Sequence, residues 1–389
     1  MERKRIEYLD YVKAFAIISV LLNHGAIEFR GMNCFTMAVF FISSGYTYNS
    51  DKDSFGVCFS KKLKRLMVPF FVAMAVSAVL EVIRAPFIGY GSAKAAIAVI
   101  ANLIYGSGLF PNFGRLGQVL MDIPPFAYNS KYMIDIIMPT DCQMWTLPAM
   151  FFGYMFFYFY RKLVKKKSNL TDIAAILVLL LLTSIETIPS IFQLPFGIGR
   201  GFFCAAFMIV GYWFREHQVF EDTNIVRIIL MMILSVAVTV ISVLLGSDAT
   251  GMVISNYGPY GVLSVALTFL CGLCSGYVMI MICRFIHSLS IKPVNNMLAV
   301  VGRNTMEIYL WHFVVIFIFD VIFILLFNPV LSPGKFYDEL FTEGYLFYRI
   351  MRTIFTVICL CLFGEMKTKW KVGKTTIAFY VVENSQKFS

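Results

Sequence analysis

Long apolar stretches, separated by short polar segments, repeat along almost the whole chain. Each is close to the 20 or so residues that a helix needs to cross a hydrocarbon core about 30 Å thick. We expect ten spanning helices, of which the second and fourth are short. The predicted segments are 9–28, 33–48, 66–88, 145–160, 172–190, 198–214, 224–245, 259–283, 298–328 and 342–364.

The distribution of Lys and Arg decides how a weaker apolar stretch, 94–109, is interpreted. With ten spans and an inner N-terminus, the inner segments hold 21 basic residues and the outer segments hold 7. This asymmetry is typical of cytoplasmic loops. An eleventh span at 94–109 would put the basic segment 161–167 outside. We therefore expect 94–109 to be re-entrant or surface-lying, and both termini to be cytoplasmic.

Composition supports a membrane protein. The chain is 59% hydrophobic and only 14% charged, whereas a soluble chain carries about 25% charged residues. Orientation and attraction to anionic lipid account for most of the net charge of +10. The basic residues are scattered over short loops, so nucleic acid is not an expected partner. The sequence predicts an all-α, polytopic membrane protein with a single domain, 1–389.

The first apolar segment carries ionisable residues along one face. Asp10 and Lys13 are one helical turn apart, and Lys13 precedes His24 by 11 residues, close to three full turns. Lys13 and His24 then lie about 16 Å apart along the helix axis. Pairing and snorkelling at the cytoplasmic boundary can explain Asp10 and Lys13. His24 lies deeper, where an ionisable group is a functional candidate, or else a structural histidine bonded to a neighbouring helix.

Two other features allow less specific interpretations. Cys271 and Cys274 form a CxxC inside an apolar segment without further ligands at metal spacing, so we expect buried packing thiols and no metal site. Cys34 and Cys142 both fall near the expected outer surface, where they could pair. The long segment 110–144 is either a lid or binding loop, or a connector lying against lipid.

Six motifs in order resemble those of one family. The first motif is Lys13 with His24 eleven residues later. The others are AVFFISSGYTY (38–48), KKLKRLMVPFF (61–71), MWTLPAMFF (144–152), LPFGIGRGFFCAAFMIVGYWF (194–214) and VGRNTMEIYLWH (301–312). Together they resemble the acyltransferase 3 family, integral-membrane enzymes that commonly O-acetylate bacterial cell-envelope glycans. Two positions depart from the family. Lys13 stands where Arg is commoner, and Lys62 with Arg65 stands where the family has two arginines. Lysine cannot form the bidentate hydrogen bonds of an arginine guanidinium, so one such contact is lost at each of the two places.

The resemblance implies an O-acyltransferase in the bacterial cytoplasmic membrane. Its co-substrate would be acyl-CoA, most simply acetyl-CoA, with no permanently bound cofactor, and its acceptor a hydroxyl of a glycan or related small molecule. His24 would be the general base, because imidazole titrates near neutral pH, and Asp10 and Lys13 complete the catalytic set. The residues expected to hold the acyl-CoA are Lys13, Lys62, Lys64 and Arg65.

Further residues are candidates for an acceptor pocket or acyl tunnel. Tyr309 and His312 share a helix face and are either tunnel residues or an interhelical hydrogen-bonded pair. Arg303 and Glu307 are expected to pair at i,i+4 spacing. Arg349 and Arg352 lie in an apolar segment, with Asp10 and Glu307 as the expected counter-charges. The whole candidate set is Ser44, Trp145, Tyr309, His312, Arg349 and Arg352.

A transporter or exporter of a polar solute or glycan is the alternative function, since it would use the same charges within the membrane. Transporters often show internal repeats with broken helices in matching halves. The two halves of this chain show no such symmetry, which favours the enzyme. Membrane lipid is an expected partner in either case, and the sequence carries no signal for the oligomeric state.

Overall fold

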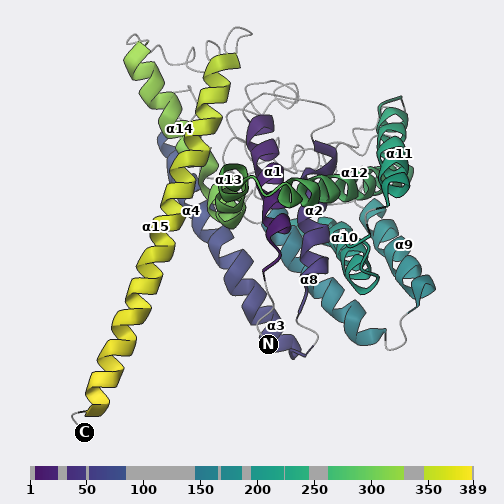
Figure 1. Cartoon of the computed structure of the whole chain (residues 1–389), viewed down its shortest axis with the longest axis horizontal. Coiled ribbons are helices and arrows are strands. Elements are labelled where there is room, and N and C mark those ends of the chain that lie inside the picture. The colour runs from purple at the N-terminus through teal and green to yellow at the C-terminus, as the bar shows by residue number, and fades with distance from the viewer. Residues whose placement is uncertain are drawn as a thin grey trace, which may run out of the picture.

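The computed structural model describes residues 5–24, 33–49, 52–84, 145–164, 168–185, 194–222, 224–244, 262–327 and 346–387, and the regular structure in these ranges is helical. The helices gather into a bundle from which the end of the last helix projects (Figure 1). In chain order the elements are α1 (Glu7–His24), α2 (Asn33–Tyr46), α3 (Phe55–Lys62), the π-helix η1 (Leu63–Met67), α4 (Val68–Arg84), α8 (Thr146–Leu163), α9 (Asn169–Ile185), the short 3-10 helix η5 (Pro195–Gly197), α10 (Ile198–Glu216), α11 (Ile225–Leu244), α12 (Val262–Ser288), α13 (Lys292–Arg303), α14 (Thr305–Phe327) and α15 (Leu346–Lys387).

Every predicted apolar segment contains a helix, although the lengths vary. Among the described residues, two helical stretches are long and apolar enough to cross a membrane, Val262–Ser288 and Phe347–Trp370. Shorter apolar helices occupy Phe35–Tyr46, Asn169–Ile185, Ile225–Ile241 and Thr305–Phe319. The number of spans and the side of the termini therefore stay predictions. The segments 94–109 and 110–144 lie outside the described residues.

The ninth predicted segment, 298–328, was expected to be one helix, and this expectation is wrong. The chain forms two helices, α13 and α14, that meet at Asn304. The Asn304 side-chain amide donates hydrogen bonds to the Val300 carbonyl oxygen (2.9 Å) and to the Glu365 carboxylate of α15 (3.1 Å). Asparagine competes with helical backbone bonding in this way. The corner is thereby fixed against α15.

The expected pair of Arg303 and Glu307 is also replaced by contacts to α15. Arg303 lies 3.6 Å from the Glu365 carboxylate, and Glu307 accepts a hydrogen bond from Lys367 at 2.5 Å. The turn at Asn304 separates the two residues that one continuous helix would have placed at i,i+4 spacing. Figure 1 shows α14 and α15 running side by side.

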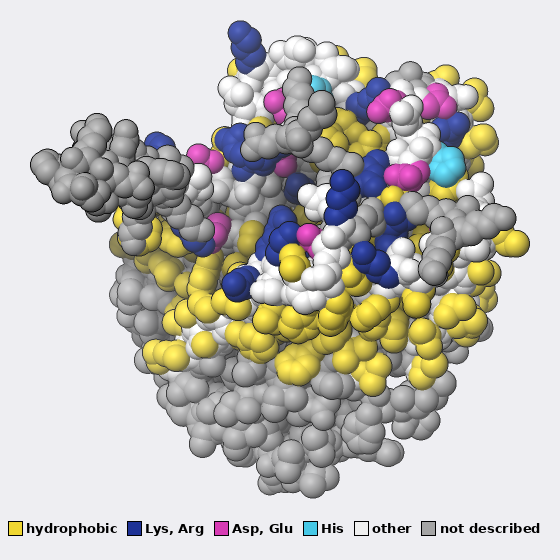
Figure 2. All heavy atoms as spheres, turned by 90° about the horizontal axis from the view of Figure 1, so that it is seen from below, with side chains coloured by type: hydrophobic (Ala, Val, Ile, Leu, Met, Phe, Trp, Pro, Cys, Tyr) yellow, Lys and Arg dark blue, Asp and Glu magenta, His cyan; other side chains and the backbone are white. Residues whose placement is uncertain are grey.

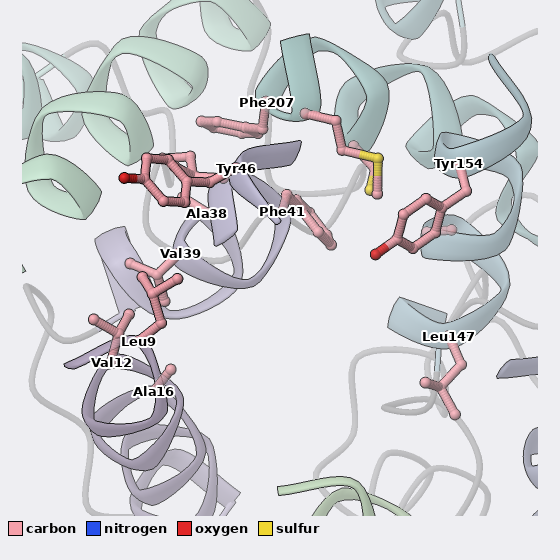
Figure 3. Packing of buried hydrophobic residues seen from close by; sticks show 14 of the residues in the cluster. Leu9, Val12, Ala16, Ala38, Val39, Phe41, Tyr46, Leu147, Tyr154 and Phe207 are labelled. Atoms are coloured by element: carbon pink, nitrogen blue, oxygen red, sulfur yellow. The ribbon is translucent and has the colours of Figure 1, made fainter. Parts of the chain in front are cut away.

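Glycines allow α2 and α10 to cross closely. A Cβ on Gly45 would collide with the backbone carbonyl of Met208, and one on Gly211 would collide with that of Ile42. Small residues at a crossing let two backbones approach, as is common between membrane helices. Around this crossing, the buried side chains of α1, α2, α8 and α10 form one hydrophobic core (Figure 3).

The helix that joins α3 to α4 widens into a π-helix at η1. Pro69 follows it and has no N–H to donate to the carbonyl of Arg65, with which its ring would also clash in an α-helix. The N–H of Val68 bonds instead to the Leu63 carbonyl, five residues back. A π-bulge commonly occurs at functional sites. Here it falls inside the basic segment.

The two CxxC thiols are confirmed as packing residues. Cys271 and Cys274 are both buried inside α12. Whether Cys34 pairs with Cys142 lies outside what the structure describes.

Candidate functional site

Asp10 organises the N-terminal end of α1 as predicted, with one addition. Its carboxylate is buried, 3% exposed, and accepts a hydrogen bond from the Lys13 ammonium at 3.3 Å. The unanticipated partner is Arg5, whose Nε donates at 2.5 Å. Gly302 of α13 packs on the Asp10 backbone. One buried carboxylate thus holds two partly exposed cations at the start of α1.

His24 is the last residue of α1. It shares one helix with Lys13, as the spacing predicted. Its side chain is not among those that the structure describes, so its catalytic role remains a prediction.

The basic segment begins with Lys62 at the end of α3 and continues with Lys64 and Arg65 in η1. The Lys62 ammonium lies 3.4 Å from the centroid of the Tyr154 ring on α8. An ammonium over an aromatic face is held by the negative charge of the π-system. Lys64 and Arg65 are exposed. The segment therefore keeps one cation against the bundle and directs two to the surface.

Basic side chains also gather on the molecular surface. Figure 2 shows Lys and Arg concentrated in one zone of the face seen from below, beside a wide band of hydrophobic side chains. Cytoplasmic edges of membrane proteins combine these two features. Exposed apolar residues on α9 and α11 fit a surface that faces lipid.

Four residues, two of them candidates from the sequence, come from three different helices into one buried group, named the inner cluster. Trp145 precedes α8 and Thr146 begins it, while Tyr309 and Arg200 come from α14 and α10. The Arg200 guanidinium carbon lies 4.6 Å from the centroid of the Trp145 ring. Thr146 hydrogen-bonds to the Tyr309 hydroxyl through its side chain and its backbone. Tyr309 therefore does make the interhelical hydrogen bond that was one of its two predicted roles.

His312 lies one turn beyond Tyr309 and is fully buried, 0% exposed. Its Nδ1 lies 3.1 Å from the Ile308 carbonyl oxygen and 2.9 Å from the Tyr309 carbonyl oxygen. A carbonyl oxygen only accepts, so Nδ1 carries the proton and Nε2 is the acceptor in the neutral ring. His312 therefore bonds through Nδ1 to carbonyl oxygens of its own helix, those of Ile308 and Tyr309.

The remaining candidates come from α2 and α15. Ser44 is buried in α2. Arg352 is buried in α15 with its guanidinium 5.6 Å from the Tyr348 ring, and Arg349 is half-buried one turn earlier. Asp10 and Glu307, the counter-charges expected for these arginines, make ion pairs elsewhere: Asp10 binds Arg5 and Lys13, and Glu307 binds Lys367.

Arg200 is the residue that sequence reasoning missed. It was counted among the charges of the outer loops, yet it is 1% exposed in the first turn of α10. The signal was present, since a single Arg within an apolar segment is by default a functional candidate. The boundary of that segment was too uncertain to separate a loop residue from a buried one.

A family model described as an acyltransferase domain matches residues 6–365, nearly the whole chain. The chain belongs to the acyltransferase 3 family. This confirms the resemblance that the six motifs indicated, and it shows that the protein is an acyltransferase of a membrane-associated family. Neither the curated proteins nor the solved structures include a match to it.

Proposed function

We propose that this acyltransferase moves an acyl group, most simply acetyl, from cytoplasmic acyl-CoA to a hydroxyl of a cell-envelope glycan or related small acceptor. The enzyme works in the bacterial cytoplasmic membrane, with acyl-CoA as a co-substrate and no resident cofactor. Family membership supports acyl transfer in general. The arrangement of cations around α1 and η1 supports the choice of donor.

The observation that carries the proposal is the basic segment at η1. The Lys62 ammonium is held against Tyr154, and Lys64 and Arg65 extend to the surface from the π-helix. A CoA donor carries several phosphate charges, which Lys and Arg recognise through charge-assisted hydrogen bonds. The half-buried cation would bind the phosphate nearest the bundle, and the two exposed cations would attract the rest.

The first helix links donor and acceptor in this proposal. Lys13, fixed by Asp10, binds the phosphate or pantetheine portion of the donor near the cytoplasmic end of α1. About 16 Å further along the same helix, His24 removes the proton of the acceptor hydroxyl. Placing donor and base on one rigid helix keeps their separation constant during the reaction.

Acetyl-CoA consumption by the purified protein tests the proposal. Detergent-purified enzyme is incubated with labelled acetyl-CoA and a panel of sugars and oligosaccharides, and free CoA thiol and labelled product are measured. We expect acceptor-dependent thiol release that His24→Ala abolishes. If thiol release stays at the rate of protein-free buffer with every acceptor, while vesicles containing the protein move a glycan across their membrane, the protein is an exporter.

A further inference from the structure

Tyr154 of α8 is a buried aromatic residue that contacts a cation of the basic segment directly. The Lys62 ammonium lies 3.4 Å from the centroid of the Tyr154 ring. A ring face attracts an ammonium within about 6 Å of its centroid. Tyr154 is 8% exposed and Lys62 is half-buried, so water screens this contact less than it would at an open surface. The ring therefore fixes where the charge of Lys62 lies.

A second tyrosine of α8 attaches the other end of α3. Tyr158 follows Tyr154 by one helical turn on the same face of α8, and its hydroxyl donates a hydrogen bond to the Asp53 carbonyl oxygen at 3.0 Å. The Asp53 carboxylate in turn accepts hydrogen bonds from the Lys61 ammonium at 3.0 and 3.1 Å. The α8 helix thus holds α3 at both ends, through Tyr158 ahead of its first turn and through Tyr154 at its last residue.

Aromatic contacts join the two helices between these attachments. The ring centroids of Phe55 and Phe159 lie 5.2 Å apart in a stacked arrangement, and those of Phe59 and Phe151 lie 5.4 Å apart edge to face. Aromatic pairs of this kind stabilise packing beyond the area that they bury. They fix the position of α3 itself, whereas Tyr154 acts on the charge at its end.

Fixing the ammonium in advance favours the binding of an anion. A lysine side chain is flexible, and confining it to one place costs conformational entropy. Because Tyr154 already confines Lys62 in the free protein, less freedom is lost when a ligand binds. An ammonium carries three N–H groups, so contact with a ring on one side is compatible with donation to a phosphate oxygen on the other.

We propose that Tyr154 positions Lys62 for a phosphate of the acyl donor and thereby makes the site select CoA thioesters over pantetheine thioesters, which lack phosphate. This role rests on the proposed donor site at η1 and adds the residue that sets its specificity. Tyr154 acts through Lys62, so it is a positioning residue and not a catalytic one.

Calorimetric titration of the detergent-purified full chain with CoA tests this role. Tyr154→Leu removes the ring, and we expect the affinity for CoA to fall about three- to tenfold, the effect of losing a partly buried cation–π contact. Tyr154→Phe keeps a ring and should bind CoA within about twofold of wild type. In a Lys62→Gln background, Tyr154→Leu should change the affinity by less than about twofold, because the cation through which the ring acts is gone.

A comparison of two thioesters separates positioning from a general loss of structure. Thiol release is measured with acetyl-CoA and with S-acetylpantetheine, which has the same reactive group and no phosphate. Tyr154→Leu should raise the KM for acetyl-CoA, while the KM for S-acetylpantetheine and the kcat per folded molecule stay unchanged. An equal rise in both KM values would show damage to the fold and would overturn the role.

Phe151 supplies a matched control on the same helix. It is also a buried ring, 5% exposed, but its partner on α3 is Phe59 and not a lysine. Phe151→Leu should lower the thermal midpoint and leave the CoA affinity per folded molecule unchanged. If it weakens CoA binding as much as Tyr154→Leu does, packing of α3 in general is responsible, and the specific role of Tyr154 is overturned.

The remaining outcomes separate this role from the donor site on which it rests. An unchanged or higher CoA affinity in Tyr154→Leu would overturn the positioning role, as would an equal loss of affinity in the Lys62→Gln background. If Tyr154→Leu does not give monodisperse protein, Tyr154→Met decides by the same criteria. Unchanged CoA affinity in Lys62→Gln alone would instead refute the proposed donor contact of Lys62, and the role of Tyr154 with it.

Discussion

Replacing Lys13 with Met tests whether the start of α1 binds the donor. The substitution removes the ammonium and keeps a side chain of similar length. A lost charge-assisted hydrogen bond to CoA costs about 1.5–3 kcal/mol, and each 1.4 kcal/mol is about a tenfold change in affinity. We therefore expect the KM for acyl-CoA to rise about 10- to 100-fold.

Two further substitutions at this site should have smaller effects. Asp10→Asn leaves Lys13 charged but held less firmly. The Lys13 side chain is 35% exposed, so the lost ion pair contributes less than about 1 kcal/mol and KM should rise less than about fivefold. Lys13→Arg keeps the charge and should remain active.

The assay measures KM from thiol release, with folded protein quantified by size-exclusion chromatography. Arg5→Gln is the matched control, because Arg5 is the other partner of Asp10 and its side chain is 57% exposed. It should leave KM unchanged. If Lys13→Met lowers folded yield but not donor affinity per folded molecule, Lys13 only sets the depth of the helix by snorkelling. The proposed donor contact would then be refuted.

Three other predictions concern the base, the basic segment and the helix crossing. His24→Ala should preserve expression and lower activity about 10²–10⁴-fold, as loss of a general base does, and retention of more than about a tenth of wild-type activity contradicts this role. Replacing the basic side chains around η1 by Gln should weaken calorimetric CoA binding without changing membrane orientation, and unchanged binding would leave them a topology signal alone. The substituted residues are Lys62, Lys64 and Arg65. Gly211→Ala should destabilise the protein by about 1–3 kcal/mol through overpacking. Gly56→Ala should not, because nothing lies within 4 Å of its added Cβ. If the two variants unfold at the same thermal midpoint, the close crossing of α2 and α10 is contradicted.

Hydrophobic pattern and local spacing predicted the local features of this fold. Each apolar segment contains a helix, and Asp10 pairs with Lys13 one turn away, because both facts depend on residues close in sequence. The thiols of Cys271 and Cys274 are buried for the same reason. Family motifs carried the prediction of acyl transfer.

Contacts between distant segments were the ones that sequence could not supply. The break at Asn304 is fixed by Glu365, 61 residues away, and apolar residues continue on both sides of it. Lys367 competes successfully for Glu307 because α15 returns beside α14. Arg200 meets Trp145 and Tyr309 only after three helices have packed together. Local spacing contains no information on these partners.

The π-helix between α3 and α4 makes the direction of the basic segment depend on chain length. A π-bulge amounts to one extra residue in a helix, and each residue turns an α-helix by about 100°. Deletion of one residue within Leu63–Met67 would remove this extra residue and rotate Lys62 by about 100° relative to α4, away from Tyr154. An evolving chain can therefore lose the alignment of this segment while every positive charge in it remains.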